Sequence, residues 1–451
     1  MDISIFKSIS DNIIDKLSNI ENYIKSVWEM PRSPIYENYV ITLDRISDID
    51  IIQKILTHTN IELQIQEWQD LGIVGNMFTI DDIIVDGMLI DKYQHLPIDT
   101  KYFKDLEYEI LSLFEDLDNA LDGWLIKSEN YQALNTILPK FNDKIQTIYI
   151  DPPFNKDKNA DYHYNVKYRN SSWATMLENR LHLAKNCLNE KGSIFVRCDY
   201  NGNWIVRLLM DDIFGKENFR NEIIVWRGSP KAGLFIQFGD LKSIGVMYDN
   251  LYWFSKSVNT GYTGFIKALP EKRNGYWANF KKIYDRPTMR YEILGINLDK
   301  GQWMWNRERA LQAVENYKIY LEESKITNES IEEYWLRMDK KLEFVRRQGD
   351  TIQYWVTPKD TTLLDNNWLD IPGYSSGWGF STENSEALLK RVIESTSNKS
   401  DLVMDFFLGS GTTTAVAHKL GRKWLGVEMG EHFYSIILPR MKKVLFYDKS
   451  G

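Results

Sequence analysis

The tetrad Asp151-Pro152-Pro153-Phe154 combines residue types that could bind an amino group and make it reactive. Two prolines fix φ and remove backbone donors, so the carboxylate and the local carbonyls can be held ready to accept hydrogen bonds. The phenylalanine adds an aromatic face. Acceptors beside an aromatic plane suit a nucleobase that carries an exocyclic amine. Taken alone, the tetrad is also compatible with a rigid turn after a strand.

A second segment, far downstream, has the pattern of a nucleoside-binding loop. Residues 401–414 predict a buried strand, a glycine turn and the start of a helix. Gly409 and Gly411 let the backbone approach a ligand closely, and the helix that follows offers unpaired amide donors. The next strand ends at Glu428, near the offset at which dinucleotide-binding folds hold ribose hydroxyls. The pattern therefore predicts a nucleoside cofactor beside this loop.

Parallel strands of an α/β fold must position both segments. The apolar run 145–150 ends directly before the tetrad, and open α/β sheets bind ligands at the carboxyl ends of such strands. We expect a helix over 174–190, a strand over 193–198, and a helix over 412–420 that is capped by Gly421.

On these residues the chain resembles the β class of DNA amino-methyltransferases, in which an Asp-Pro-Pro-Tyr/Phe motif precedes a Phe-x-Gly-x-Gly motif. The similarity is greatest to adenine-specific enzymes such as the Mod subunits of type III restriction-modification systems. It extends from about residue 123 to residue 445. The segments that carry it are 125–134, 151–155, 172–173, 180–181, 195–199, 213–219 and 381–384.

The resemblance implies a Rossmann-like α/β methyltransferase fold with a mostly parallel, seven-stranded sheet in circularly permuted order. It implies site-specific methyl transfer from S-adenosyl-L-methionine to the exocyclic amino group of adenine in double-stranded DNA. The implied catalytic residues are Asp151, Pro152, Pro153 and Phe154. The implied cofactor-binding residues are Asn130, Asp199, Thr382, Asn384, Asp405, Phe407, Gly409, Ser410, Gly411, Thr412, Thr413 and Glu428.

Amino-group methylation sets clear demands on the catalytic tetrad. The base must leave the stack, because its amine lone pair is delocalised into the ring. Asp151 would accept one amino hydrogen and the Pro152 carbonyl the other, while Phe154 stacks on the ring. This aims the lone pair at the methyl donor without a covalent intermediate. A carboxylate of ordinary pKa is a poor candidate for a strong general base.

Two segments depart from the pattern of the family. Ser128-Glu129-Asn130 stands where many relatives have Gly-Asp-Asn, and residues 382–385 stand where many have Thr-x-Lys-Pro. Amide and hydroxyl groups there replace a lysine charge, which would change cofactor affinity without removing the site. We expect cofactor binding to persist.

Two other functions remain open. Cytosine N4-methylation uses the same fold and acceptors, although the Asp of the tetrad favours adenine, because cytosine enzymes more often have Ser there. A non-catalytic DNA-binding specificity subunit is the second, and the intact Asp151 and Gly409-Ser410-Gly411 weigh against it. The sequence has no Gly-x-x-x-x-Gly-Lys-Ser/Thr loop for a triphosphate, so a restriction or translocase activity would belong to a separate partner subunit.

We expect four sections along the chain. Residues 1–120 form an accessory region, which serves oligomerisation or partner docking or, equally, caps the catalytic fold. Residues 121–225 form the catalytic half, 226–375 a target-recognition region, and 376–451 the cofactor half. The net charge of −8 argues at first against DNA. Basic and aromatic residues nevertheless alternate between residues 272 and 347, as in a DNA face or, equally, a solvated surface over an aromatic core.

Composition limits the remaining partners. Relatives commonly act in pairs, so the resemblance implies a homodimer. Cys187 and Cys198 lack a metal or redox spacing, and the six histidines include no close pair, so no metal is expected. We recognise no signal peptide and no long apolar span, which favours a cytoplasmic location away from membranes.

Overall fold

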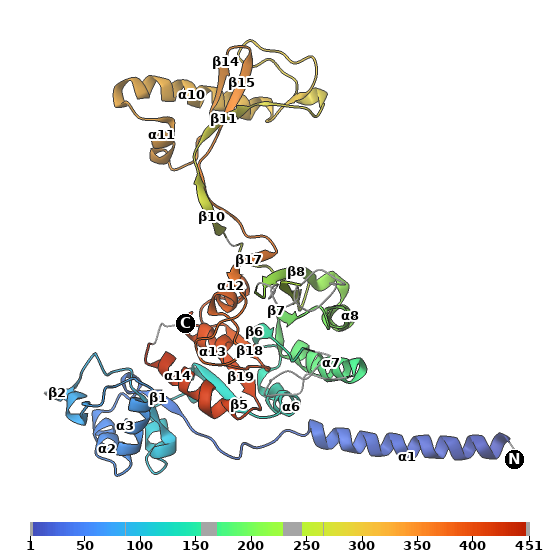
Figure 1. The fold of residues 1–451 in the computed structure, drawn as a ribbon, viewed down its shortest axis with the longest axis vertical. Helices are drawn as coiled ribbons and strands as arrows, with labels where there is room; N and C mark the ends of the chain where they lie inside the picture. Colours follow the sequence, from blue (N-terminus) through green and yellow to red (C-terminus); the bar gives the residue numbers. More distant parts are fainter. Residues whose placement is uncertain (1–2, 86, 155–168, 229–245, 265, 448–451) are drawn as a thin grey trace, which may run out of the picture. The chain divides into compact units, whose positions relative to one another are not determined.

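The computed structural model describes residues 3–85, 87–154, 169–228, 246–264 and 266–447. Asn155 of the resembling segment and His163 lie outside these ranges. The chain divides into two compact units. The first comprises Met1–Thr263 with Asp365–Gly451, and the second comprises Gly264–Leu364 (Figure 1).

The first unit is built around an eight-stranded sheet with the order β17-β8-β9-β7-β6-β18-β19-β5. Strands β7, β6, β18, β19 and β5 run parallel, β9 is antiparallel to both of its neighbours, and β17 is parallel to β8. The strands are β5 (Gly123–Lys127), β6 (Ile145–Ile150), β7 (Leu188–Cys198), β8 (Phe219–Trp226), β9 (Tyr248–Ser255), β17 (Asn367–Pro372), β18 (Leu402–Asp405) and β19 (Lys423–Glu428).

This sheet confirms the expected α/β class and its mostly parallel order. It has one strand more than the seven expected, because β17 returns to pair beside β8 at the edge of the sheet. The sequence signal for β17 is weak, because the short segment begins with Asn367 and ends with Pro372, and both residue types are uncommon in strands.

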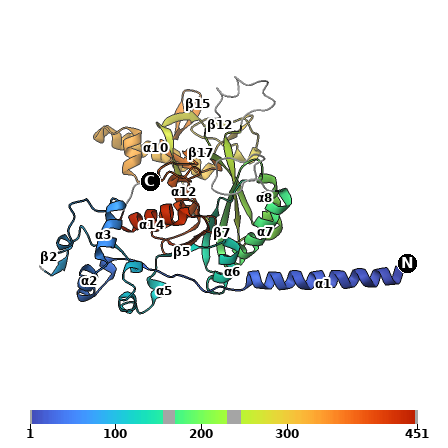
Figure 2. The same ribbon diagram turned by 60° about the horizontal axis from the view of Figure 1, so that its bottom comes forward.

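Helices cover the sheet, as Figure 2 shows from a second direction. Helix α7 buries Trp173, Leu177, Leu181 and Ala184, a stripe at helical spacing that fixes the face it presents to the sheet. It begins and ends a few residues earlier than expected. The helices are α6 (Asn130–Phe141), α7 (Asn170–Cys187), α8 (Asn203–Phe214), α12 (Glu386–Thr396), α13 (Thr412–Lys419) and α14 (Leu438–Leu445).

The N-terminal part of the first unit has its own small core around the buried Leu43, Trp68 and Phe103. Lys442 of α14 joins it to the sheet region, since its buried ammonium lies 2.7 Å from Glu67 and 2.6 Å from Asp99. The elements of this part are α1 (Ile3–Glu29), β1 (Val40–Thr42), α2 (Ile49–Leu56), α3 (Ile61–Asp70), β2 (Ile84–Val85), β3 (Met88–Leu89), β4 (Pro97–Asp99), α4 (Glu107–Leu111) and α5 (Leu117–Ala120).

The second unit lies within the stretch expected to recognise the target. Its aromatic residues divide between interior and surface: Trp303 is buried, whereas Tyr276 and Tyr284 are exposed. Arg309 pairs with Glu343 in this unit. The elements are β10 (Ile266–Arg273), β11 (Tyr276–Asn279), β12 (Lys281–Lys282), β13 (Gln302–Trp303), α10 (Arg307–Thr327), α11 (Ile331–Arg337), β14 (Val345–Gln348), β15 (Thr351–Val356) and β16 (Lys359–Leu363).

None of the helices in the described ranges has the length and apolarity that crossing a membrane requires.

Candidate active site

A cavity of about 460 Å³ opens at the carboxyl ends of β5, β6, β18 and β19. This is the edge at which α/β sheets bind ligands. The cavity brings together most of the residues that the sequence singled out. Those that line it are Asn130, Asp151, Pro152, Pro153, Phe154, Thr382, Asn384, Phe407, Gly409, Ser410 and Glu428.

Asn384 holds the Asp151 carboxylate in place. Its Nδ2 donates to Asp151 Oδ2 at 3.0 Å, while its Oδ1 accepts from Tyr149 Oη at 2.9 Å and from Arg197. Because the guanidinium can only donate, the amide oxygen must face it, and the amide NH₂ must then face Asp151. The side chain expected from the resemblance to contact the cofactor thus lies against the carboxylate.

Arg197 is fully buried and fixes the position of the Asn384 side chain. Its guanidinium pairs with Asp249 Oδ2 at 2.8 Å, donates to the Gly373 carbonyl at 2.9 Å and lies 4.0 Å from the ring centroid of Tyr374. The Tyr374 hydroxyl donates to the same Asp249 oxygen at 3.1 Å. A buried charge with this many partners is held in one geometry.

Sequence reasoning missed Arg197, Asp249 and Tyr374. They come from β7, from β9 and from the segment after β17, which are far apart along the chain. The available signal was an arginine inside the otherwise apolar run Phe195–Cys198, because such a residue needs a buried partner.

Burial raises the pKa of Asp151 to about 6, although the Arg197 charge and the hydrogen bond from Asn384 both favour the ionised form. The carboxylate is therefore mostly ionised at neutral pH, yet it binds a proton more tightly than an ordinary aspartate. This changes the expectation from the sequence, which assumed an ordinary carboxylate pKa.

The proline loop is fixed by an indole. Trp173 Nε1 donates to the Pro153 carbonyl at 2.8 Å. The indole itself is packed against Gly202, where an added Cβ would lie 2.4 Å from the Trp173 ring. Phe154 is buried beside the cavity, with the Arg227 guanidinium 5.9 Å from its ring centroid. Packing therefore sets the position of the tetrad as much as its prolines do.

The glycine loop and the acidic end of β19 form the other side of the cavity. Gly409 has φ +57°, and its amide donates to Glu428 Oε2 at 2.9 Å. The amides of Met429 and Gly430 donate to Oε1 at 2.9 and 2.8 Å. Burial raises the pKa of Glu428, but His432 and these amides outweigh it, so the net pKa is below its usual value. Glu428 thus offers the cavity an ionised acceptor.

Five predicted residues do not line the cavity: Asp199, Asp405, Gly411, Thr412 and Thr413. Asp405 accepts from the Phe407 amide at 2.9 Å and from the Thr413 hydroxyl at 2.5 Å, so it shapes the glycine loop from behind. Asp199 accepts from the Asn201 amide at 3.0 Å and lies 3.5 Å from Arg227.

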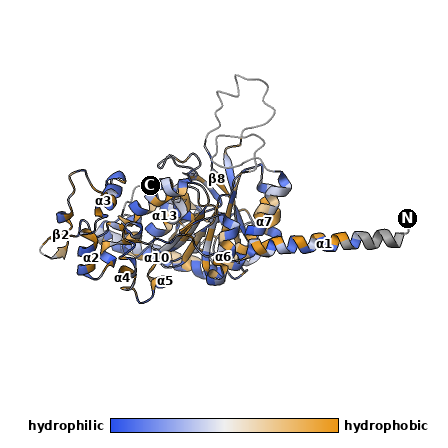
Figure 3. Cartoon of the chain, turned by 90° about the horizontal axis from the view of Figure 1, so that it is seen from below, coloured by the Kyte–Doolittle hydropathy of each residue, from blue (hydrophilic) through white to orange (hydrophobic). Residues whose placement is uncertain are grey.

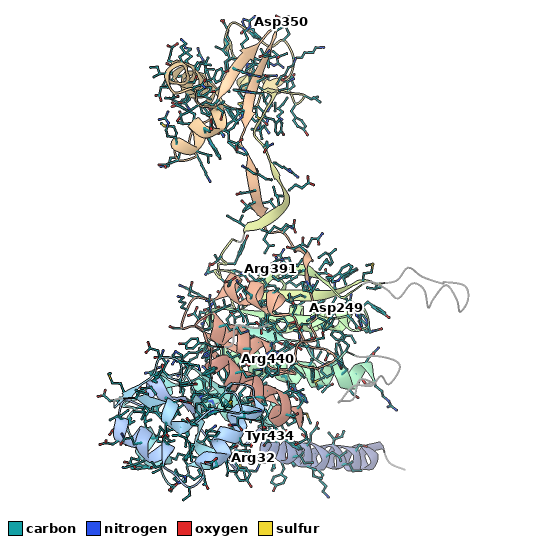
Figure 4. The ribbon with its side chains drawn as sticks, turned by 60° about the vertical axis from the view of Figure 1, so that its left-hand side comes forward. Arg32, Asp249, Asp350, Arg391, Tyr434 and Arg440 are labelled. Carbon is teal, nitrogen blue, oxygen red and sulfur yellow. The ribbon has the colours of Figure 1, made fainter. Side chains whose placement is uncertain are left out.

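A buried arginine that the sequence did not indicate supports the same loop. Arg440 of α14, labelled in Figure 4, donates to Thr412 Oγ1 at 2.9 Å and to the Ser410 carbonyl at 3.3 Å. It also pairs with Glu383 at 3.2 Å and with Glu386 at 2.9 Å. The loop conformation therefore depends on α14.

Asp405 should leave a signature in the pH dependence of stability. Burial raises the pKa of Asp405 to about 7. The stability that protonated Asp405 contributes to the folded state is therefore fully present below the pKa of the unfolded state, and it is lost as the pH rises through 7. Asp405→Asn cannot ionise. The free energy of unfolding of this variant, relative to the parent, should therefore rise by roughly 2–3 kcal/mol between pH 5 and pH 8. Urea titrations at several pH values measure this, and a pH-independent difference would contradict it.

The described residues contain no group of three His, Cys, Asp or Glu side chains placed to hold a metal ion.

Known proteins similar to this chain include a subunit of a restriction-modification enzyme and a type II methyltransferase. The type III restriction-modification enzyme HindVI Mod subunit of Haemophilus influenzae, described as probable, is 27% identical over 73% of this chain and 51% of that protein. The type II methyltransferase M.EcaI of Enterobacter cloacae is 24% identical over 68% of this chain and 67% of that protein. The chain spans about half the length of the first of these relatives.

Among solved structures, the cytosine-N4-specific PvuII DNA methyltransferase aligns with a TM-score of 0.40 at 13% identity, over 72% of this chain and 91% of that one. The model of the DNA methylase family matches residues 145–439. These residues include both sides of the cavity. Since this match covers well over half of the chain, the protein belongs to the DNA methylase family.

Proposed function

We propose that the protein transfers a methyl group from S-adenosyl-L-methionine to the exocyclic amino group of adenine in double-stranded DNA. The observation that carries this proposal is that a single cavity joins the Asp151-Pro-Pro-Phe154 tetrad to the Gly409 loop and Glu428. One side offers acceptors and an aromatic ring for an amino-bearing base. The other offers an open backbone and an ionised carboxylate for a nucleoside.

The residues present fit the proposed cofactor. Glu428 is ionised and oriented by three amides, so its remaining lone pairs can accept from ribose hydroxyls. Gly409 has φ +57°, which glycine adopts without strain, and a Cβ added there would occupy space beside the Phe380 ring, 3.6 Å away, at the wall of the cavity. S-adenosyl-L-methionine would supply a methyl group carried on a sulfonium.

The opposite side of the cavity prepares the nucleophile. Asp151 Oδ2 already accepts from Asn384, which leaves the other carboxylate oxygen to accept an amino hydrogen of the base. This bond favours a more tetrahedral nitrogen and orients its lone pair. After transfer the nitrogen carries a positive charge, which the adjacent carboxylate stabilises. With a pKa of about 6, Asp151 can then take up the proton that the methylated amine releases.

Adenine is the proposed target because the tetrad begins with Asp, and several matched relatives are named Mod subunits of type III enzymes. The unit Gly264–Leu364 is the proposed target-recognition element, with exposed Tyr276, Ile283 and Tyr284 among its basic residues. We also propose a cytoplasmic enzyme that acts as a homodimer, with restriction carried by a separate subunit. Cytosine N4-methylation is the second candidate, since the acceptor set suits either amine.

The direct test is transfer of labelled methyl groups from S-adenosyl-L-methionine to unmethylated duplex DNA, followed by mass analysis of the nucleosides. Labelled N6-methyladenine is the expected product. Labelled N4-methylcytosine would replace adenine with the second candidate. Cofactor binding without any transfer to DNA would contradict a self-sufficient enzyme and favour the non-catalytic specificity subunit.

Glu428 gives a test of the cofactor side alone. Glu428→Gln removes the charge and turns an amide donor toward the loop amides, so the dissociation constant for S-adenosyl-L-methionine should rise by roughly 10–100-fold. Calorimetric titration measures it without DNA. Glu431→Gln is the matched control, because this exposed carboxylate pairs with Lys127 rather than facing the loop. Equal affinities in the two variants would remove Glu428 from the cofactor site.

A further inference from the structure

Helix α1 presents an apolar face that nothing in the described structure covers. Five of its aliphatic side chains, at positions 13, 17, 20, 24 and 27, are between 37% and 60% exposed. Its contacts with α6 lie at its C-terminal end, where Glu29 accepts from Tyr131 and the Met30 carbonyl accepts from Gln132. A single amphipathic helix gains most of its stability from packing of its apolar face, so this face calls for a partner.

The spacing of the exposed residues identifies the kind of partner. Ile13, Leu17, Ile20, Ile24 and Val27 follow one another at intervals of four, three, four and three, a period of 3.5. This is the period of a coiled-coil seam. In the corresponding heptad, Ile13, Ile20 and Val27 occupy d positions, and Leu17 and Ile24 occupy a positions. Figure 3 shows apolar and polar residues interspersed along the described part of α1.

The flanking positions favour a parallel copy of the same helix. Lys16 occupies g and Glu21 the following e position, so two helices in register would place each lysine opposite the glutamate of the other chain. The next such pair is Tyr23 with Trp28, and both are exposed. Antiparallel packing about the centre of Ile3–Glu29 would instead oppose Lys16 with its own copy.

We propose that α1 binds α1 of a second copy of this chain as a parallel, in-register coiled coil. Burying these seam and flanking side chains removes on the order of 1,000 Å² from water for a helix pair, near the lower limit for a specific interface. Two chains joined in this way form the homodimer proposed above; because Leu at a with Ile at d also suits three or four helices, the size of the assembly is an outcome of the test. The assignment does not rest on the proposed methyl transfer.

Sedimentation of the full chain over a range of concentrations tests the seam. The parent should form an oligomer, and Leu17→Asp with Ile24→Asp should weaken association at least 100-fold. Asn19→Asp with Asn22→Asp adds the same charge to the opposite face of the helix and should leave association unchanged. Circular dichroism and cofactor binding verify that each variant is folded. A monomeric parent, or an oligomer that survives the seam variant, would overturn the proposal.

Cross-linking tests orientation and register. Ile20→Cys should form an intermolecular disulfide under mild oxidation, since equal d positions face one another only in the parallel, in-register assembly. Asn22→Cys, on the outer face, should not. Background is low because Cys187 and Cys198 are both buried. Mixing Lys16→Glu with Glu21→Lys should favour mixed over like assemblies at least tenfold, and a random mixture would exclude the parallel register.

Discussion

Replacing Asp151 with alanine is expected to lower the rate of methyl transfer at least ~10³-fold, because the variant loses both the acceptor for the amino hydrogen and the charge beside the developing cation. Cofactor affinity should change by less than about threefold, since the glycine loop and Glu428 supply the nucleoside contacts proposed here. Single-turnover transfer to duplex DNA measures the rate, and calorimetric titration measures the affinity.

Asp122→Ala is the matched control for this experiment. It removes a carboxylate just before β5, at the opposite end of the sheet from the cavity, where Asp122 lies 3.6 Å from Arg45. Its transfer rate should match that of the parent. If Asp151→Ala methylated DNA at the parental rate, the tetrad would not be the catalytic side of the cavity.

Replacing Asn384 with leucine is expected to lower the transfer rate at neutral pH roughly 10–100-fold and to move the acid limb of the pH profile upward. The variant loses the amide hydrogen bond that favours ionised Asp151, so the pKa of Asp151 should rise above about 6. A group needed in its ionised form is lost as the pH falls through its pKa. The deficit should therefore shrink as the pH is raised.

Asn384→Asp extends this test, because a second carboxylate beside Asp151 should raise its pKa further. Ser381→Ala lines the same cavity and is the matched control, whose acid limb should stay in place. A rate deficit in Asn384→Leu that is equal at every pH would show that the amide acts only on the fold. Asn384 is in this sense a positioning residue, since it touches the carboxylate rather than the base.

The elements that carry the cavity could be predicted because each has a strong local signal. The run that ends at Ile150, directly before Asp151, and the run that ends at Glu428 are strands, and Gly421, with φ +71°, follows α13 as expected of a helix cap. Local patterns decide these elements, and the carboxyl ends of parallel strands then meet at one edge. The position of the cavity at this edge therefore follows from the parallel order of the strands.

The support for the catalytic carboxylate could not be predicted, because it depends on contacts between strands of distant sequence. Arg197 meets Asp249 only after β9 inserts antiparallel between β7 and β8. The raised pKa of Asp151 is likewise a result of burial, which no spacing reveals. Strand β17 was missed because its ladder partner, rather than its own composition, makes it a strand.

The buried Lys442 has a consequence for the modularity of the chain. Helix α14 holds the glycine loop through Arg440 and, two residues later, the N-terminal region through the pairing of Lys442 with Glu67 and Asp99. A substitute region that covered Lys442 without these two carboxylates would leave a buried ammonium unpaired, a defect of roughly 3–5 kcal/mol, on the same helix that shapes the cofactor side. The N-terminal region is therefore not an interchangeable module: a replacement would have to supply acceptors for Lys442 or be matched by a new residue at position 442.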